Sequence, residues 1–157
     1  MTVYRLFPDA RALWSTLLTK EFSDLLREAE EQAQHLPTAR ERLIETTVCG
    51  VERIAGDALV RKVLELEPEL LVPYIVERLG QSQQLAMREF RRYLEEGQTD
   101  GSIRRVDVEV VTYLLQLVVG SVVLATRVTE RESDPAAISA ELRRMLEAYL
   151  APTAEGG

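Results

Sequence analysis

Apolar residues recur at helical spacing along almost the whole chain. Near its start, Leu18, Phe22, Leu25 and Ala29 follow one another at steps of four, three and four residues, which places them on one face of a helix. Almost every segment has helical rather than strand periodicity, and no β-hairpin signal is present. The pattern therefore predicts an all-α protein of about six helices packed as a bundle.

Capping residues mark where the helices begin. Thr38 and Glu41 have the spacing of a capping box, in which the hydroxyl and the carboxylate each accept a backbone N–H. Asp134 precedes Pro135, and proline suits the first helical turn. The helices are expected to begin near Asp9, Thr38, Asp57, Pro68, Asp107 and Asp134, and the first two to end before Pro37 and at Gly56.

The helix that opens at Pro68 is the longest expected one. It is predicted to run to Glu96, with a bend at Pro73 or Gly80, and Gly97 is its expected C-terminal glycine. Residues 97–102, Gly-Gln-Thr-Asp-Gly-Ser, are the clearest loop signal in the chain. The pattern therefore predicts that this loop separates the long helix from the last two.

Residues 110–125 form the most apolar stretch. A helix that spans a membrane needs roughly 18–20 apolar residues. This stretch is shorter, and Thr112, Gln116, Gly120 and Ser121 interrupt it. We therefore interpret it as a buried helix and expect no membrane partner.

The same helix is apolar nearly all round, which means that both of its sides need cover. This favours a homodimer in which it and the last helix pair with their symmetry copies. The alternative is a central helix covered entirely by its own chain. The predicted dimer-interface residues are Val119, Gly120, Val123, Ile138, Leu142 and Met145.

Composition narrows the function further. Asp and Glu number 26 against 19 Lys and Arg, so the formal net charge is −7. A surface that holds polyanions needs dense positive charge, which this chain lacks. Hydrophobic residues at 46% and charged residues at 29% are typical of a soluble globular domain. Cys49 is the single cysteine, which excludes an internal disulfide and fits a reducing cytoplasm.

Residues for catalysis or metal binding are not grouped in the sequence. His35 is the only histidine. Together with Glu31, one turn before it, it would supply only two ligands, which is too few for a zinc site. General acid–base catalysis needs two carboxyl groups with different pKa values, but the acidic pairs here lie in polar runs that would give them similar ones. The sequence also has no nucleophile elbow, the turn that presents a catalytic serine. The sequence therefore predicts a protein that is not an enzyme and needs no metal or cofactor.

Polar and aromatic residues on otherwise apolar faces are candidates for a ligand pocket. A buried amide or hydroxyl needs a hydrogen-bond partner, which a ligand can supply. The alternative is that Thr47 bonds its own backbone and the aromatic rings fill the core. The predicted ligand-binding residues, for a small apolar or amphipathic effector, are Trp14, Thr47, Tyr74, Gln83, Met87, Tyr113 and Gln116.

The opening of the chain resembles TetR-like (TetR/AcrR) transcriptional regulators. Thr2, Tyr4 and Phe7 match a Thr-x-Tyr-x-x-Phe segment that ends the recognition helix of their helix-turn-helix, and Leu13 matches the long helix that follows. The later order, with the loop at 97–104, an apolar helix and Asp134-Pro135, is also similar. The resemblance thus covers nearly the whole chain.

The resemblance implies a division of the chain into three parts. Residues 1–8 would be the end of the recognition helix, 9–151 a ligand-binding and dimerisation domain, and 152–157 a flexible tail. Thr2 and Tyr4 would contact DNA phosphates, which position a protein without reading sequence. The lysine that such proteins carry at the next helix start is Ala10 here. Because the rest of the helix-turn-helix is expected ahead of Met1, DNA binding is expected only of a full-length form.

The predicted function follows from this resemblance. The chain would bind an effector and dimerise, and the effector would control DNA binding by the full-length regulator. The alternative is a helical interaction module that pairs with a full-length relative without sensing a ligand.

Overall fold

The computed structural model describes residues 10–66, 80–129 and 134–153. Every regular element in these residues is a helix, which confirms the predicted all-α class. The helices are α1 (Ala10–Ala33), α2 (Ala39–Gly56), α3 (Ala58–Leu66), α5 (Gly80–Thr99), α6 (Val108–Thr129) and α7 (Pro135–Leu150). The predicted starts near Asp9 and Pro68 and the predicted bend at Pro73 lie outside the described residues.

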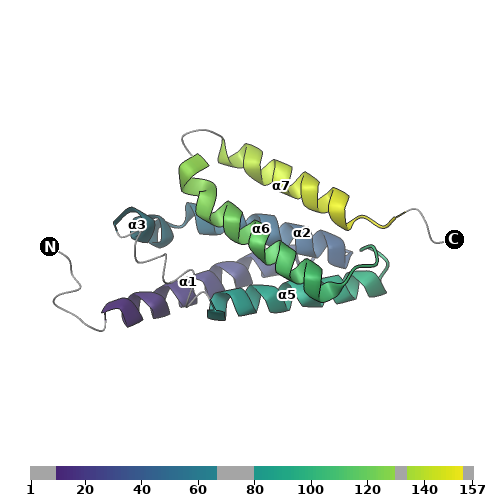
Figure 1. Cartoon of the computed structure of the whole chain (residues 1–157), viewed down its shortest axis with the longest axis horizontal. Helices are drawn as coiled ribbons and strands as arrows, with labels where there is room; N and C mark the ends of the chain where they lie inside the picture. The colour runs from purple at the N-terminus through teal and green to yellow at the C-terminus, as the bar shows by residue number, and fades with distance from the viewer. Residues whose placement is uncertain (1–9, 67–79, 130–133, 154–157) are drawn as a thin grey trace.

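Helix α2 is the centre of the bundle. It packs against α1, α5, α6 and α7, and Figure 1 shows α6 crossing it, with α1 and α5 along one side and α7 along the other. The apolar face of α2 supplies Leu43, Ile44, Val48 and Val51 to the core. This position explains why α2 contains the longest run of buried residues, from Thr46 to Val51.

The predicted caps are present. The Thr38 hydroxyl accepts the Glu41 N–H at 3.2 Å, and the Glu41 carboxylate accepts the Thr38 N–H at 3.1 Å, which completes the capping box. The Asp57 carboxylate accepts the Val60 N–H at 2.8 Å at the start of α3. Asp134 caps α7, with proline next in the chain. These ends were predictable because each cap is made by residues three or fewer positions apart.

The predicted end of α5 at Gly97 is wrong, because the helix continues to Thr99. Gly97 is buried inside the helix, where the Ile103 side chain packs over it. The glycine with a positive φ, of 78°, is Gly101 in the loop that follows. Gly97 therefore permits close packing, and Gly101 permits the turn.

The loop after α5 completes the start of α2. The Asp100 Oδ2 atom accepts the Ala39 N–H at 2.9 Å, and the Ser102 Oγ atom accepts the Arg40 N–H at 3.1 Å. The first N–H groups of a helix have no partner within it. The loop therefore supplies partners that no local residue provides, and it joins the α5 end to the α2 start.

Replacing Asp100 by alanine is expected to lower the free energy of unfolding by about 1–2 kcal/mol at pH 7, as for a lost helix cap. Desolvation opposes ionisation, but hydrogen bonds from Ser102 and the Ala39 N–H lower the pKa of the Asp100 carboxyl. A lowered folded-state pKa gives stability that is present above the unfolded-state pKa and is lost as pH falls.

Urea unfolding at pH 7 and near pH 3 measures this effect. The difference in the free energy of unfolding between wild type and Asp100→Ala should be smaller at the lower pH. The matched control is Glu147→Ala, an acidic residue exposed on α7, which should change little at either pH. Equal stability of Asp100→Ala and wild type at pH 7 would contradict the prediction.

The core is packed most fully near the turns that precede α2 and follow α5. The largest fully buried apolar side chains there are Tyr93, Leu43, Leu94, Leu146 and Leu150. Along the second half of α6, Val118, Val119, Val122 and Val123 are only partly buried. Packing therefore loosens along α6 away from this end.

Candidate functional site

Three buried polar atoms have no hydrogen-bond partner within the described part of the chain. They are Thr46 Oγ1 on α2, and Thr112 Oγ1 and Gln116 Oε1 on α6. Thr46 is 3% exposed and Thr112 is 0% exposed. Leaving a buried polar group unpaired costs about 1–3 kcal/mol. We call these three residues the unpaired set, and they mark where a polar group from outside the fold would be stabilised.

Thr47 differs from the unpaired set. Its hydroxyl donates to the Leu43 carbonyl at 2.7 Å, so its hydrogen bond is made within its own helix. This is the alternative that the sequence left open for this residue. Sequence reasoning missed Thr46 as a site residue and saw Thr112 only as an interruption of an apolar stretch, because both look like ordinary threonines in a helix.

Gly50 on α2 has no described side chain close to it. Gly50 is buried, yet a Cβ built on it meets no described atom within 4 Å beyond its chain neighbours and its own helix backbone. Thr46 lies one turn before Gly50 on the same face of the helix. On α6, a Cβ built on Gly120 meets only Gln116 Nε2 among described atoms, at 3.9 Å. Thr46 and Gln116 therefore each lie one turn before a glycine. The described part of the chain leaves room beside both glycines.

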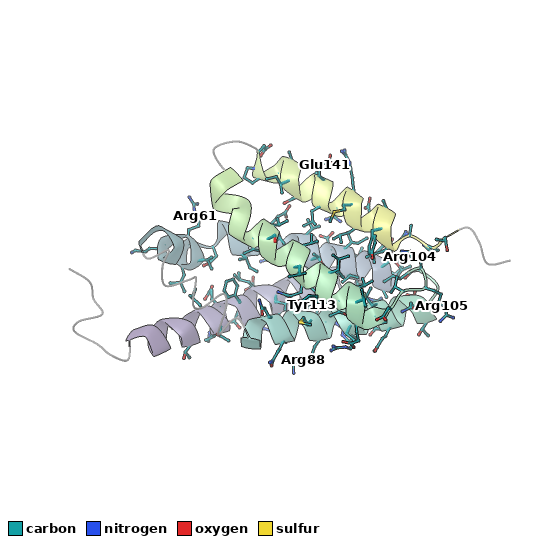
Figure 2. The ribbon with its side chains drawn as sticks, viewed as in Figure 1. Arg61, Arg88, Arg104, Arg105, Tyr113 and Glu141 are labelled. Atoms are coloured by element: carbon teal, nitrogen blue, oxygen red, sulfur yellow. The ribbon has the colours of Figure 1, made fainter. Side chains whose placement is uncertain are left out.

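The α5–α6 hairpin brings several predicted residues to one level. Arg91 on α5 donates to both carboxylate oxygens of Glu109 on α6, at 2.6 and 2.8 Å. Because consecutive helices in a hairpin are antiparallel, one turn back along α5 is one turn forward along α6. This register places Met87 level with the turn of Thr112, and Gln83 level with the turn of Gln116. Figure 2 shows this level, where Arg88 and Tyr113 are labelled.

The predicted ligand residues are thus partly brought together. Gln83 and Met87 are partly buried on the α5 side of this hairpin, and Gln116 is partly buried on the α6 side. Tyr113 lies on the outer face of α6 and is 59% exposed. Trp14 belongs to α1, but its side chain lies outside the described residues, as does all of Tyr74. The ligand-binding roles of all seven residues stay predictions.

A second feature is a set of large apolar side chains that are exposed on α6 and on α7. On α6 its members follow helical spacing, and on α7 they are one turn apart. We call this the apolar face, and its residues are Val110, Tyr113, Leu114, Leu117, Met145 and Tyr149. Val110 and Leu117 are 63% and 51% exposed. Large apolar residues gathered on one surface are typical of a protein interaction site.

The predicted dimer residues lie on the same two helices but mostly on other sides of them. Met145 belongs to the apolar face, whereas Leu142 is buried in the core of its own chain. Val119, Gly120, Val123 and Ile138 are partly buried. Nothing in the sequence could separate the two sides of α6, because apolar residues occur all round it.

Electrostatic contacts join α1 to the rest of the bundle. Arg92 on α5 pairs with Glu30 on α1 as well as with Glu89 and Glu96 on its own helix. Burial, followed by repulsion from Glu89, raises the pKa of the Glu30 carboxyl. On the other side of α1, Arg53 of α2 pairs with Glu28 at 2.7 Å. These pairs are partly exposed, so each stabilises the position of α1 only weakly.

The described residues hold no group of three or more His, Cys, Asp or Glu side chains that could bind a metal ion. Searching the same residues reveals no helix with the length and apolarity to cross a membrane. The candidate functional features of the described residues are therefore the unpaired set, with the room beside Gly50 and Gly120, and the apolar face.

Comparison with known proteins identifies the family. No protein-family model matches the chain. An uncharacterised HTH-type transcriptional regulator of Mycobacterium tuberculosis is 33% identical over 149 residues, which cover 95% of this chain and 76% of the relative. An uncharacterised HTH-type regulator of Mycobacterium bovis is 32% identical over the same coverage.

Two solved structures share the fold. The transcriptional regulator FadR from Bacillus subtilis, in complex with stearoyl-CoA, matches with a TM-score of 0.72 and 19% identity over 94% of this chain and 80% of FadR. A regulatory protein of the tetR family from Rhodococcus matches with a TM-score of 0.61 and 20% identity, over 95% of this chain and 78% of its own. The chain therefore belongs to the HTH-type transcriptional regulators, and its helical fold is that of TetR-family regulators.

Proposed function

We propose that this chain is the effector-binding and dimerisation body of a TetR-like regulator, in which a small molecule controls DNA binding by the full-length protein. The unpaired set carries the proposal, together with the room that the described residues leave beside Gly50, one turn from Thr46. Ligand sites are mostly apolar with a few placed polar groups, and this part of the bundle has that composition. The likeness to FadR, whose solved structure holds stearoyl-CoA, supports an amphipathic effector.

The proposed response is a shift between two positions of α1. A ligand changes such an equilibrium only if it binds one position more tightly than the other. The charged contacts of α1 with Arg53 and Arg92 are individually weak, so they resist a change in its position less than the buried side chains Leu18, Ala29 and Ala33 do. Since α1 is expected to follow the recognition helix, its movement would change the spacing of two DNA-reading units in a dimer.

The proposed dimer pairs the apolar face with its copy. Residues of α6 and α7 from each chain would form an isologous four-helix interface, with Leu117 as the last member of the α6 contribution. Pairing would remove the large exposed apolar side chains from water.

Thermal unfolding in the presence of stearoyl-CoA and of decanol tests the effector proposal. A ligand at 100 times its dissociation constant stabilises the folded state by about 2.7 kcal/mol. For a chain of this size the midpoint should rise by about 5–10 °C. We expect at least one of the two amphiphiles to produce this rise.

A matched pair of variants locates the site. Gly50→Leu adds a large side chain at a buried glycine that has no described atom beside it, whereas Gly56→Leu adds the same group at an exposed helix end. The ligand-induced rise in the unfolding midpoint should be lost in Gly50→Leu and kept in Gly56→Leu. No rise with either amphiphile in a dimeric wild type would instead favour the helical interaction module that senses nothing.

A further inference from the structure

We infer that the effector carries an uncharged group that donates a hydrogen bond, a hydroxyl or an amide, and that Gln116 and Thr112 hold this group inside the bundle. The inference rests on the proposed effector site and names the chemistry that the site selects. It follows from the hydrogen bonds that Gln116 and Thr112 can make, and from the lack of buried charged side chains among the described residues.

The buried atom of Gln116 calls for a donor. Its Oε1 atom accepts hydrogen bonds only, and it has no partner within the described residues. Thr112 lies one turn before Gln116 on the same face of α6, and its hydroxyl both donates and accepts. A single hydroxyl group between them can donate to Gln116 Oε1 and accept from Thr112. An ether or an alkane would leave the Gln116 oxygen unpaired.

The interior favours an uncharged group. The buried polar side chains in the described part of the chain are Thr46, Thr47, Thr112 and Ser139, and none carries a charge. Along the hairpin, Arg91 and Glu109 pair with each other and are partly or fully exposed, and Arg88, at the level of Thr112, is exposed, so none of these charges is buried beside the Thr112 hydroxyl. A carboxylate placed beside Thr112 would lose its hydration without gaining an opposite charge, which is strongly unfavourable. The site therefore selects against fatty acids in their ionised form.

The inference has a consequence for the ligand-free protein. An unpaired buried hydroxyl destabilises the fold, so replacing Thr112 by valine, which has nearly the same shape, should raise the midpoint of thermal unfolding by about 2–6 °C. Thr47→Val is the matched control, because the Thr47 hydroxyl already donates to the Leu43 carbonyl. Removing that bonded hydroxyl should leave the midpoint unchanged or lower it. A purely structural hydroxyl at Thr112 would lower the midpoint on removal as well.

Binding is tested with three probes of equal chain length: decanol, methyl decyl ether and decanoate. Titration calorimetry at neutral pH should show wild type binding decanol about 10-fold more tightly than the ether, as expected for one hydrogen bond to a buried partner, and decanoate more weakly than decanol. In Thr112→Val and Gln116→Leu the preference for decanol over the ether should fall to within about twofold. Thr47→Val should keep it.

The outcomes separate this inference from the proposal beneath it. Equal binding of decanol and the ether by wild type, tightest binding of decanoate, or a decanol preference that survives Thr112→Val and Gln116→Leu would overturn the inference and leave an effector site of different chemistry. If none of the three probes binds and neither they nor stearoyl-CoA shift thermal unfolding, the effector proposal fails together with the inference.

Discussion

Replacing Gly97 by alanine should destabilise the protein by about 3 kcal/mol, the upper range for overpacking a filled core. A Cβ built on Gly97 lies 2.9 Å from Ile103 Cβ and 2.5 Å from Ile103 Cγ1. Rotating the Ile103 side chain moves Cγ1 but not Cβ, and the Ile103 N–H donates to the Gly97 carbonyl at 2.9 Å. The backbone must therefore shift, which would strain this hydrogen bond and the nearby loop contacts with α2.

Urea unfolding followed by circular dichroism measures the loss. Gly50→Ala is the matched control, because it adds the same methyl group to a helical glycine that has open space beside it. Alanine is the better helix former, so this control should gain about 0.5–1 kcal/mol. Equal unfolding midpoints for Gly97→Ala and wild type would show that Ile103 can move aside and that the close approach is not required.

Replacing Leu117 by glutamate should convert the proposed dimer to a monomer, with a rise in the dimer dissociation constant of at least about 100-fold. Leu117 is 51% exposed in the single chain, so the substitution should leave the fold of each chain intact. In an isologous interface the change occurs twice, which buries two unpaired carboxylates in an apolar contact. Val110, Tyr113 and Leu114 on the same face would lose their cover as a result.

Sedimentation velocity at micromolar concentration distinguishes the two states. Leu17→Glu is the matched control, since Leu17 is an exposed leucine, at 41%, on α1 rather than on the apolar face. This variant should remain dimeric, and both variants should keep the helical circular dichroism of wild type. A wild type that is monomeric at this concentration would reject the dimer. A Leu117→Glu variant that stays dimeric would contradict an interface at the apolar face and would favour the interface predicted from the sequence, at Val119, Gly120 and Val123.

Helix identity and many helix ends were readable from the sequence because they depend on neighbours along the chain. Thr38 reaches Glu41, and Asp57 reaches Val60, over three positions. The Gly97 prediction was wrong for a tertiary reason. A glycine near a helix end usually terminates it, but here Ile103 occupies the space beside it, and the helix continues.

The candidate site shows the same division. Gln83, Met87 and Gln116 could be singled out as candidates because polar or flexible side chains on apolar helix faces are uncommon, and their ligand-binding role stays a prediction. Thr46 and Thr112 were not, since a threonine on a helix usually bonds a carbonyl of its own preceding turn, as Thr47 does. Only the fold shows which hydroxyl is left unpaired.

By itself the sequence determined that this protein is a bundle of capped helices with a strongly apolar helix near its end, because periodicity and capping act over one or two turns. The tertiary structure alone decided which side of α6 faces the core and which side carries Val110 and Leu117 at the surface. The physical reason is that a helix apolar on every side has no preferred direction of burial. Its orientation is set by the shapes of α2 and α5 against which it packs.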